Sequence, residues 1–321
     1  MRIISVSDLK KVYNKDIIAI DGVNLEINEG EVFGFLGPNG AGKSTTINIM
    51  TGKLRPTSGT VVVMGHTLPQ DANRLAPKIG YVPQELVFFE YLTIQENLTL
   101  FASCFEIPDS KARITEVMNL LQIDDLKNRR SDKLSGGQKR RLNLAIGLIH
   151  KPEILFLDEP SAGMDPQSRN ILWESIEKMA GNEKITIILT THLMETAERL
   201  SDRIAIIDHG KIQAIDTPQG LKKKYGVGDI IELEYNADAT EETINSLNRQ
   251  IVEKFGADVT RLKDAKLSIS SLDGVNTLID LSRLIEEKES KSAIKLLSIH
   301  ESSLEDVFIK ITGTELREDN E

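Results

Sequence analysis

The stretch EVFGFLGPNGAGKST, residues 31–45, joins an apolar β-type run directly to a glycine-rich loop. Residues 37–44 match G-x-x-x-x-G-K-S, and apolar side chains at Ile47, Met50 and Leu54 predict a helix after the loop. A strand, such a loop and a helix in this order distinguish a phosphate-binding loop from a chance run of glycines. The stretch therefore predicts an α/β core of the P-loop NTPase type, whose loop binds the phosphates of a nucleotide.

The loop has the composition needed to hold a triphosphate. Backbone amides around its glycines can surround the β-phosphate, and the ammonium group of Lys43 can reach the β- and γ-phosphates. The hydroxyl of Ser44 is a suitable Mg²⁺ ligand, because Mg²⁺ prefers oxygen and keeps several of its waters. The predicted nucleotide-binding residues of the loop are Gly37, Pro38, Asn39, Gly40, Ala41, Gly42, Lys43, Ser44 and Thr45.

A second motif, ILFLDE at residues 154–159, ends an apolar β-type run with two acidic residues. Successive strand residues point to opposite faces, so Asp158 and Glu159 face different directions. We expect Asp158 to bind hydrated Mg²⁺ and Glu159 to act as the base for an attacking water. Two adjacent acids at a strand end can also be a solvated turn, but the loop beginning at Gly37 favours the catalytic interpretation.

The segment LSGGQKRR, residues 134–141, places two glycines at the start of a predicted helix. Ser135 and Gln138 form the S-x-x-Q pattern of a capping box, which predicts Ser135 as the N-cap. Gly136 and Gly137 have no Cβ at the positive end of the helix dipole, so we expect both to let an anion such as phosphate approach. The chain thus contains two predicted phosphate sites.

The composition restricts the class of protein. A chain of 321 residues suggests two domains, and 40% hydrophobic with 27% charged residues fits a globular protein with a substantial core. The net charge of -10 argues against a nucleic-acid partner, which would favour a basic surface. The single cysteine, Cys104, excludes a disulfide framework and a cysteine-rich zinc site, and its apolar neighbours predict that it is buried.

No apolar run reaches the roughly 18 residues that cross a bilayer. The apolar part of the N-terminus is too short for a signal peptide. We therefore expect a cytoplasmic protein, and any membrane-spanning part of its machinery should belong to another subunit.

The periodicity of apolar residues predicts a first domain at residues 1–225. It begins with a β-rich stretch at residues 3–36, and a helical segment at about 85–150 interrupts its α/β core. The strand DRIAIID then leads into a closing hairpin with its turn at His209–Gly210. This organisation predicts an antiparallel β subdomain and a helical insert around one α/β core.

The pattern changes after Tyr225, and we expect a second domain at residues 226–321. Its predicted element order, β-α-β-β-α-β, is that of a ferredoxin-like α+β domain. A terminal helix follows, with Ser302 and Glu305 as its predicted capping box.

Together these motifs closely resemble those of the ATP-binding cassette (ABC) ATPases, and the resemblance covers about residues 1–225. The LSGGQ segment is highly specific to that family. The resemblance implies that Lys43 and Ser44 belong to the Walker A loop, and that Asp158 and Glu159 belong to Walker B. The matching segments are GPNGAGKST (37–45), YVPQE (81–85), LSGGQ (134–138), ILFLDEP (154–160), SAGMD (161–165) and TTH (190–192).

The resemblance also implies roles for single residues. Gln84 resembles the Q-loop residue, which senses the γ-phosphate side of the site, is a candidate Mg²⁺ ligand and links to the transmembrane partner. His192 resembles the switch histidine that contacts the γ-phosphate, and Tyr13 resembles the aromatic residue that stacks on adenine. Asp165 belongs to the D-loop, which communicates between subunits, and Met164 stands where leucine is more usual. Each of these residues, taken singly, is also compatible with an ordinary packed or capping role. The functional roles are supported by the fact that all of them occur in the order typical of the family.

In the family, the LSGGQ segment of one subunit covers the γ-phosphate of ATP bound by a second, antiparallel subunit. The resemblance therefore implies an ATP-dependent, head-to-tail homodimer, or a heterodimer with a second cassette. It assigns Ser135, Gly136, Gly137 and Gln138 to the nucleotide held by the partner. This arrangement explains why one chain contains two phosphate sites.

The function implied by the resemblance is that of an ATP-binding and ATP-hydrolysing subunit of an ABC transporter. ATP and Mg²⁺ are its expected cofactors, and a transmembrane permease is its partner at the inner face of the cell membrane. The ending HESSLEDVFIKITG (300–313) is similar to that of the branch exporting drugs, antibiotics and lipids, which favours export. The alternative is a soluble ABC ATPase acting in DNA repair or translation. The DNA-repair members carry coiled-coil or zinc insertions, and the translation-associated members carry two cassettes in one chain. This sequence contains neither such insertions nor a second cassette.

Three aromatic residues, Phe88, Phe89 and Tyr91, cluster shortly after Gln84. They fit the core of the helical segment. They equally fit the groove in which this family receives a coupling helix of the membrane subunit, and the sequence leaves both interpretations open.

Overall fold

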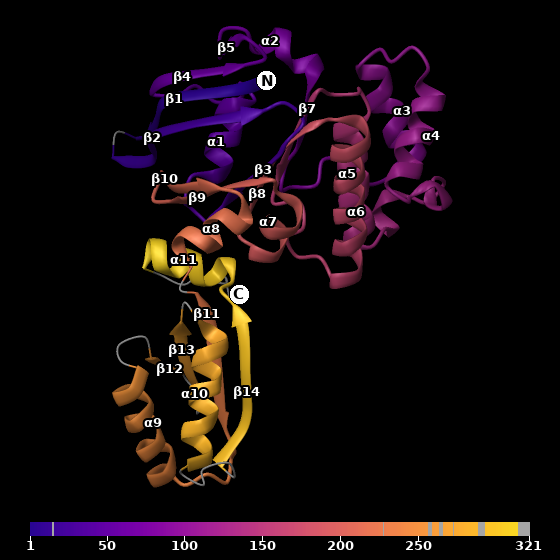
Figure 1. Ribbon diagram of the computed structural model, residues 1–321. Coiled ribbons are helices and arrows are strands. Elements are labelled where there is room, and N and C mark those ends of the chain that lie inside the picture. Colours follow the sequence, from indigo (N-terminus) through magenta and orange to yellow (C-terminus); the bar gives the residue numbers. More distant parts are fainter. Residues whose placement is uncertain are drawn as a thin grey trace. The chain divides into compact units, whose positions relative to one another are not determined.

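A computed structural model of the chain describes residues 1–14, 16–226, 228–255, 259–262, 266–271, 273–287 and 293–313. The chain forms two compact units, one of Met1–Pro218 and a second that begins at Gln219 (Figure 1). Helix α8 (Pro218–Tyr225) lies almost entirely in the second unit, whereas the predicted boundary is at its far end. Among the described residues, no helix combines the length and apolar content that a membrane crossing requires.

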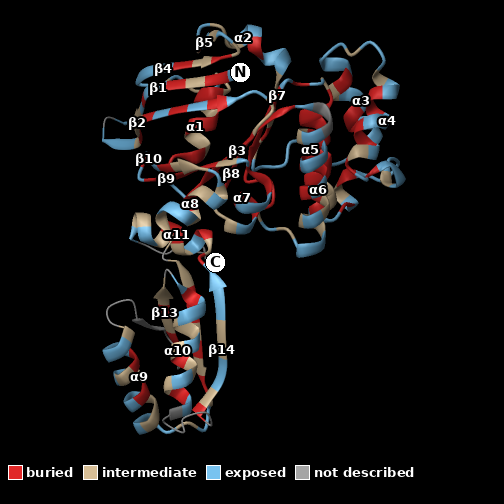
Figure 2. Cartoon of the chain, in the orientation of Figure 1, coloured by how far each residue is buried: buried red, intermediate tan, exposed pale blue. Residues whose placement is uncertain are grey.

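A six-stranded sheet forms the centre of the first unit, in the order β10-β9-β3-β8-β7-β6. β10 is antiparallel to β9, and the other neighbouring pairs are parallel. Every residue of β3 and β7 is buried, as expected for apolar strands with both faces covered (Figure 2). The strands span Val32–Leu36 (β3), Ile79–Val82 (β6), Ile154–Asp158 (β7), Thr186–Thr191 (β8), Arg203–Asp208 (β9) and Lys211–Asp216 (β10).

A second sheet of the first unit is antiparallel, with the order β2-β1-β4-β5. Helix α1 (Lys43–Met50) contributes Ile47 to a core that contains side chains from both sheets, among them Ile20 and Phe35. The β-rich start predicted at residues 3–36 is thus divided between two sheets. The antiparallel strands span Arg2–Tyr13 (β1), Ile17–Asn28 (β2), Ser58–Val63 (β4) and His66–Leu68 (β5).

The helical part of the first unit, residues 94–148, lies within the segment of about 85–150 that the sequence predicts as helical. Cys104 is exposed, so the prediction of a buried cysteine is wrong. The buried face of its helix contains Ile94, Leu98 and Ala102, spaced four residues apart, and Cys104 lies two positions past this row on the opposite face. The other helices are α2 (Ala72–Leu75), α3 (Ile94–Cys104), α4 (Ser110–Leu120), α5 (Gly136–Leu148), α6 (Pro166–Glu183) and α7 (Met194–Leu200), with 3₁₀ turns at Ala76–Lys78, Asp124–Leu126 and Ser131–Lys133.

The second unit contains a four-stranded antiparallel sheet in the order β12-β13-β11-β14. Its core includes Leu233 and Leu267 from the sheet and Leu247 and Leu281 from two helices. These strands and helices follow one another as β-α-β-β-α-β. The elements are β11 (Asp229–Tyr235), α9 (Glu241–Phe255), β12 (Val259–Leu262), β13 (Lys266–Ser271), α10 (Gly274–Glu287), β14 (Ile294–Glu301) and α11 (Leu304–Thr312).

The cap of α11 differs from the predicted one by one residue. The Oγ of Ser303 accepts a hydrogen bond from the Asp306 amide at 3.2 Å, and the Asp306 carboxylate accepts one from the Ser303 amide at 2.7 Å. Ser302 instead donates its hydroxyl to the Gly228 carbonyl at 2.6 Å. The prediction of Ser302 and Glu305 as the capping box is therefore wrong, because a tertiary hydrogen bond engages the first serine.

Candidate active site

The glycine-rich loop connects β3 to α1 at the carboxyl edge of the parallel sheet, where sheets of this kind bind ligands. Gly42 is the N-cap of α1 and has a φ of 103°, a conformation that favours glycine. A Cβ on Gly42 would collide with the carbonyl oxygen of Ala19, and a Cβ on Gly37 would collide with that of Ile207. The glycines thus let the loop turn tightly into α1, whose first-turn amides suit an anion.

Lys43, the first residue of α1, is only 5% exposed. Its Nζ donates hydrogen bonds to the carbonyl oxygens of Gly37 at 2.7 Å and Pro38 at 3.2 Å. The same Nζ lies 3.2 Å from Oε1 of Glu159. The ammonium group of Lys43 is therefore held by its own loop and by the acidic residue at the end of β7.

Ser44 and Asp158, the predicted Mg²⁺ ligands, are in contact. The Ser44 hydroxyl donates to Oδ1 of Asp158 at 2.9 Å, and the Thr190 hydroxyl donates to the same oxygen at 2.6 Å. Burial, followed by the charge of Asp158, raises the pKa of Tyr81 to about 12, so its hydroxyl stays protonated beside that carboxylate. The described residues contain no group of three His, Cys, Asp or Glu that could hold a metal ion.

Glu159 is 4% exposed and lies between two potential cations. Its Oε2 is 3.0 Å from Nδ1 of His192, and its Oε1 contacts Lys43. The pKa of Glu159 lies below its usual value. Burial by itself would raise this pKa, but the hydrogen bond from His192 and the charge of Lys43 outweigh the effect of burial. Glu159 is therefore a carboxylate at neutral pH.

The loop, Gln84 and Glu159 line one hollow of about 130 Å³. This volume suits phosphate groups rather than a whole nucleotide, so base and ribose would lie outside it. Tyr13 is not among the described residues that line the hollow; it ends β1 and is 37% exposed. Its role in adenine stacking stays a prediction. The lining residues are Ala19, Pro38, Asn39, Gly40, Gly42, Lys43, Ser44, Thr45, Gln84 and Glu159.

The LSGGQ segment begins α5 with the predicted cap. The Ser135 amide donates to Oε1 of Gln138 at 3.0 Å, and the Gln138 amide donates to Oγ of Ser135 at 3.3 Å. The two glycines differ, however, because a Cβ on Gly136 would meet nothing within 4 Å, whereas one on Gly137 would collide with Ser168 of α6. The missing Cβ of Gly137 thus serves the packing of α5 against α6, and a Cβ is sterically free only at Gly136. The role of both glycines in binding phosphate stays a prediction.

Asp165 is the N-cap of α6. Its Oδ1 accepts a hydrogen bond from the Ser168 amide at 2.9 Å, and hydrogen bonding to Ser168 lowers the pKa of Asp165. Asp165 is itself exposed. The structure therefore gives Asp165 a capping role within this chain, and its role toward a second subunit stays a prediction.

Two residues that hold the acidic groups in place were missed by the sequence analysis. Arg140 of α5 donates to the main-chain carbonyl of Glu159, and Thr190 of β8 donates to the carboxylate of Asp158. Arg140 lies one turn before buried Leu144, in an otherwise apolar row of α5. A charged residue in such a row needs buried polar partners, and this was the available sequence signal.

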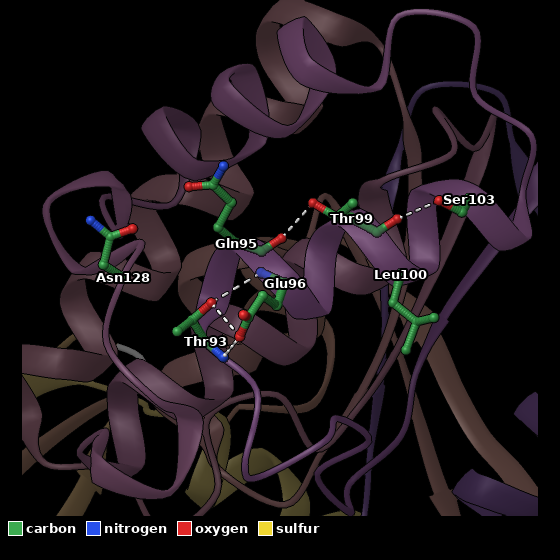
Figure 3. Close-up of a pocket in the computed structure, with 7 residues that line it drawn as sticks. All are labelled: Thr93, Gln95, Glu96, Thr99, Leu100, Ser103 and Asn128. Carbon is green, nitrogen blue, oxygen red and sulfur yellow. Dashed lines mark hydrogen bonds between the residues drawn. The ribbon is translucent and has the colours of Figure 1, made fainter.

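A larger pocket, of about 620 Å³, lies beside α3 (Figure 3). The side chains of Thr93 and Glu96 bond to each other as the cap of α3, and Thr99 and Ser103 donate to carbonyls one turn back, at 2.7 and 2.9 Å. The side chains of these four residues are therefore satisfied by the helix and its cap, and we assign no chemistry to the pocket.

Comparison with known proteins gives one consistent result. Residues 20–162 match the family described as ABC transporter. The chain is 34% identical over 323 residues to the linearmycin resistance ATP-binding protein LnrL of Bacillus subtilis (strain 168), covering 98% of this chain and 100% of that protein. It is 33% identical over 323 residues to the Nod factor export ATP-binding protein I of Ralstonia nicotianae, covering 98% and 95%. Among solved structures, a dimeric ATP-binding cassette in a post-hydrolysis state bound to ADP and Pi matches with a TM-score of 0.61 and 25% identity, over 67% of this chain and 98% of that one.

Proposed function

The chain belongs to the ABC transporter family, and on this premise we propose that it is the ATP-hydrolysing subunit of an exporter. The observation that carries the ATPase assignment is the convergence of Lys43, Ser44, Asp158 and Glu159 at one edge of the parallel sheet. Export is supported by the relative that is named as a Nod factor export protein.

Five groups of this chain would hold ATP and Mg²⁺. Lys43 and the loop amides bind the phosphates, and Ser44 and Asp158 bind the metal, with Gln84 as a further ligand. When bound, the metal neutralises charge on the phosphates. Lys43 has to exchange Gly37, Pro38 and Glu159 for phosphate oxygens in order to bind.

Glu159 acts as the base that orients and deprotonates the attacking water, and His192 supports it. The withdrawal of Lys43 removes one of the causes that lower the pKa of Glu159, which makes the carboxylate a better base.

We further propose that α5 of one subunit faces the phosphates held by Lys43 of a second subunit in an ATP-dependent dimer. The open approach at Gly136 supports this arrangement. A two-fold interface then makes two equivalent sites, each of which uses both chains. The partner is a second copy of this chain or another cassette.

Mixed dimers test the shared site. Lys43→Ala disables the phosphate loop, and Gly136→Asp places a carboxylate at the start of α5, where a Cβ would meet nothing within 4 Å. In a mixed dimer, one site contains both defects and the other contains none, so nucleotide trapping should return. Confirmed mixed dimers that trap no nucleotide would show that each chain closes its own site.

The membrane partner is proposed to dock beside the loop that follows Gln84. Phe88 packs against the core of the helical part, whereas Phe89 is 56% and Tyr91 77% exposed. The exposed pair supports a contact surface for a transmembrane subunit, which would hold the protein at the inner face of the membrane. A multi-span protein should co-purify with the chain, and co-purification with ribosomes or DNA would instead support a soluble ABC ATPase.

We assign the second unit to the ferredoxin-like arrangement. The strand order β12-β13-β11-β14, with every neighbouring pair antiparallel, and the β-α-β-β-α-β order support this assignment.

A further inference from the structure

Arg140 contacts the end of β7 and the turn after it through their main-chain carbonyls. Its Nε donates to the Pro160 carbonyl at 2.8 Å, and its Nη2 donates to the Asp158 carbonyl at 2.9 Å and to that of Glu159. Arg140 is 6% exposed. Its planar guanidinium can reach several carbonyls at once, which the single ammonium of lysine cannot do with the same geometry.

The same side chain contacts the Q-loop. Nη1 of Arg140 donates to the carbonyl oxygens of Pro83 at 2.9 Å and Gln84 at 2.8 Å. Burial lowers the pKa of Arg140, and the negative charges of Asp158 and Glu159 oppose that change. An arginine stays protonated under such conditions, so it acts here as a permanent donor.

The backbone that Arg140 holds is strained. Glu159 has a φ of 48°, in the left-handed region that non-glycine residues rarely adopt. It also precedes Pro160, and a residue before proline favours an extended conformation. On its other side the Glu159 amide donates to the Thr190 hydroxyl at 3.0 Å. Arg140 and Thr190 therefore fix the peptide units on both sides of Glu159.

From this geometry we infer that Arg140 is a positioning residue for ATP hydrolysis. It holds the Glu159 carboxylate at the attacking water and aligns this carboxylate with Gln84. The inference rests on the proposed function. Arg140 lies on the same helix as the LSGGQ segment, one turn after Gly136, so it also connects that segment to the acidic end of β7.

The neighbouring Arg141 provides a matched control. It lies on the same helix and is 8% exposed, and its Nη1 donates to the carbonyls of Leu121 at 3.0 Å and Gln122 at 2.6 Å, in the helical part. Arg140→Met and Arg141→Met each remove a buried guanidinium that bonds main-chain carbonyls. Only the first removes contacts to the acidic end of β7 and the Q-loop.

The test compares kcat for ATP, Kd for Mg·ADP and Tm in the full-length chain. We expect Arg140→Met to lower kcat about 10²-fold, as a small misplacement of a catalytic group does. Its Kd should change by no more than about 3-fold, and Arg141→Met should keep kcat within about 3-fold of wild type although its Tm also falls. A folded Arg140→Met with wild-type kcat, or an equal loss of kcat in Arg141→Met, would overturn the inference.

A second variant covers the case in which Arg140→Met does not fold. Arg140→Lys keeps the charge but reaches fewer carbonyls, so we expect an intermediate kcat, at least about 10-fold below wild type. Wild-type kcat in folded Arg140→Lys would then overturn the inference. Failure of the wild-type chain to hydrolyse ATP would overturn the proposed function and this inference together, whereas an active wild type with active Arg140 variants overturns this inference alone.

Discussion

Lys43 and Glu159 form a buried ion pair in which Nζ lies 3.2 Å from Oε1, and both side chains are 5% exposed. The residue proposed to bind phosphate is therefore in contact with the residue proposed to act as base. Each neutralises the other in a site where an unpaired charge would be costly. If the two residues have the proposed roles, this pair couples phosphate binding to activation of the base.

Glu159→Gln should leave ATP binding intact or make it tighter, because the amide holds Lys43 less strongly than the carboxylate does. Loss of the base should slow hydrolysis by at least about 10²-fold. ATP should then hold the protein as a dimer, which size-exclusion chromatography with bound-nucleotide analysis would detect.

Glu153→Gln is the control for this substitution, because Glu153 pairs with Lys78 at 2.9 Å while 53% exposed. It should hydrolyse ATP at the wild-type rate. Near-normal turnover by Glu159→Gln would show that Glu159 is not the base.

Gly136 and Gly137 should respond oppositely to alanine. A Cβ on Gly137 would collide with Ser168, and overpacking of this kind costs about 1–3 kcal/mol, so Gly137→Ala should lower Tm. Gly136→Ala has open space and gains helix propensity worth up to about 1 kcal/mol, so Tm should stay equal or rise. Equal Tm values for the two variants in thermal unfolding would contradict the packing explanation.

The residues that could be predicted from sequence are those whose chemistry requires a residue type at a local spacing. Lys43 and Ser44 follow from the loop, and the structure places them in contact with the predicted acids. The charge of Arg140 in an apolar row of α5 indicates that it has buried partners, but it does not identify them, because they are main-chain carbonyls from two distant segments. Local spacing does not encode such contacts.

The wrong cap of α11 shows a second limit. Ser302 and Ser303 each begin a pattern with an acidic residue three positions later, so local spacing fits both. The choice is made by Gly228, whose carbonyl accepts the Ser302 hydroxyl and leaves Ser303 to cap the helix. Sequence patterns identify the helix, and a tertiary contact decides its first residue.

His150 should make stability depend on pH in the mildly acidic range. Burial lowers its pKa, and the nearby charge of Arg113 lowers it further, against a hydrogen bond to the Ile79 carbonyl. The unfolded chain therefore binds a proton at about pH 6.5 that the folded chain accepts only at lower pH. His150 therefore does not lower the free energy of unfolding above about pH 6.5. This free energy should fall as the pH drops from there toward the pKa of His150 in the folded chain.

The measurement for His150 is Tm between about pH 5 and 7.5. His150→Gln should flatten the decline, whereas His209→Gln should leave it unchanged, because the His209 side chain is 94% exposed. A decline of the same size in His150→Gln would assign the pH dependence to other groups.

The first unit should fold and bind ATP without the second. The apolar clusters that include Leu157 and Phe35 contain only residues before Gln219, and the cluster around Leu233 contains only residues after it. A chain of residues 1–218 should therefore unfold cooperatively and retain Mg·ADP affinity, measured by circular dichroism and a binding titration. A chain of residues 1–225 is the matched comparison, since it keeps Leu221, which is fully buried in the intact protein and belongs to the second unit, but lacks the rest of that unit. We expect the longer piece to aggregate more than the shorter one. Insoluble protein from residues 1–218, or protein that binds no nucleotide, would show that the two units depend on a common core.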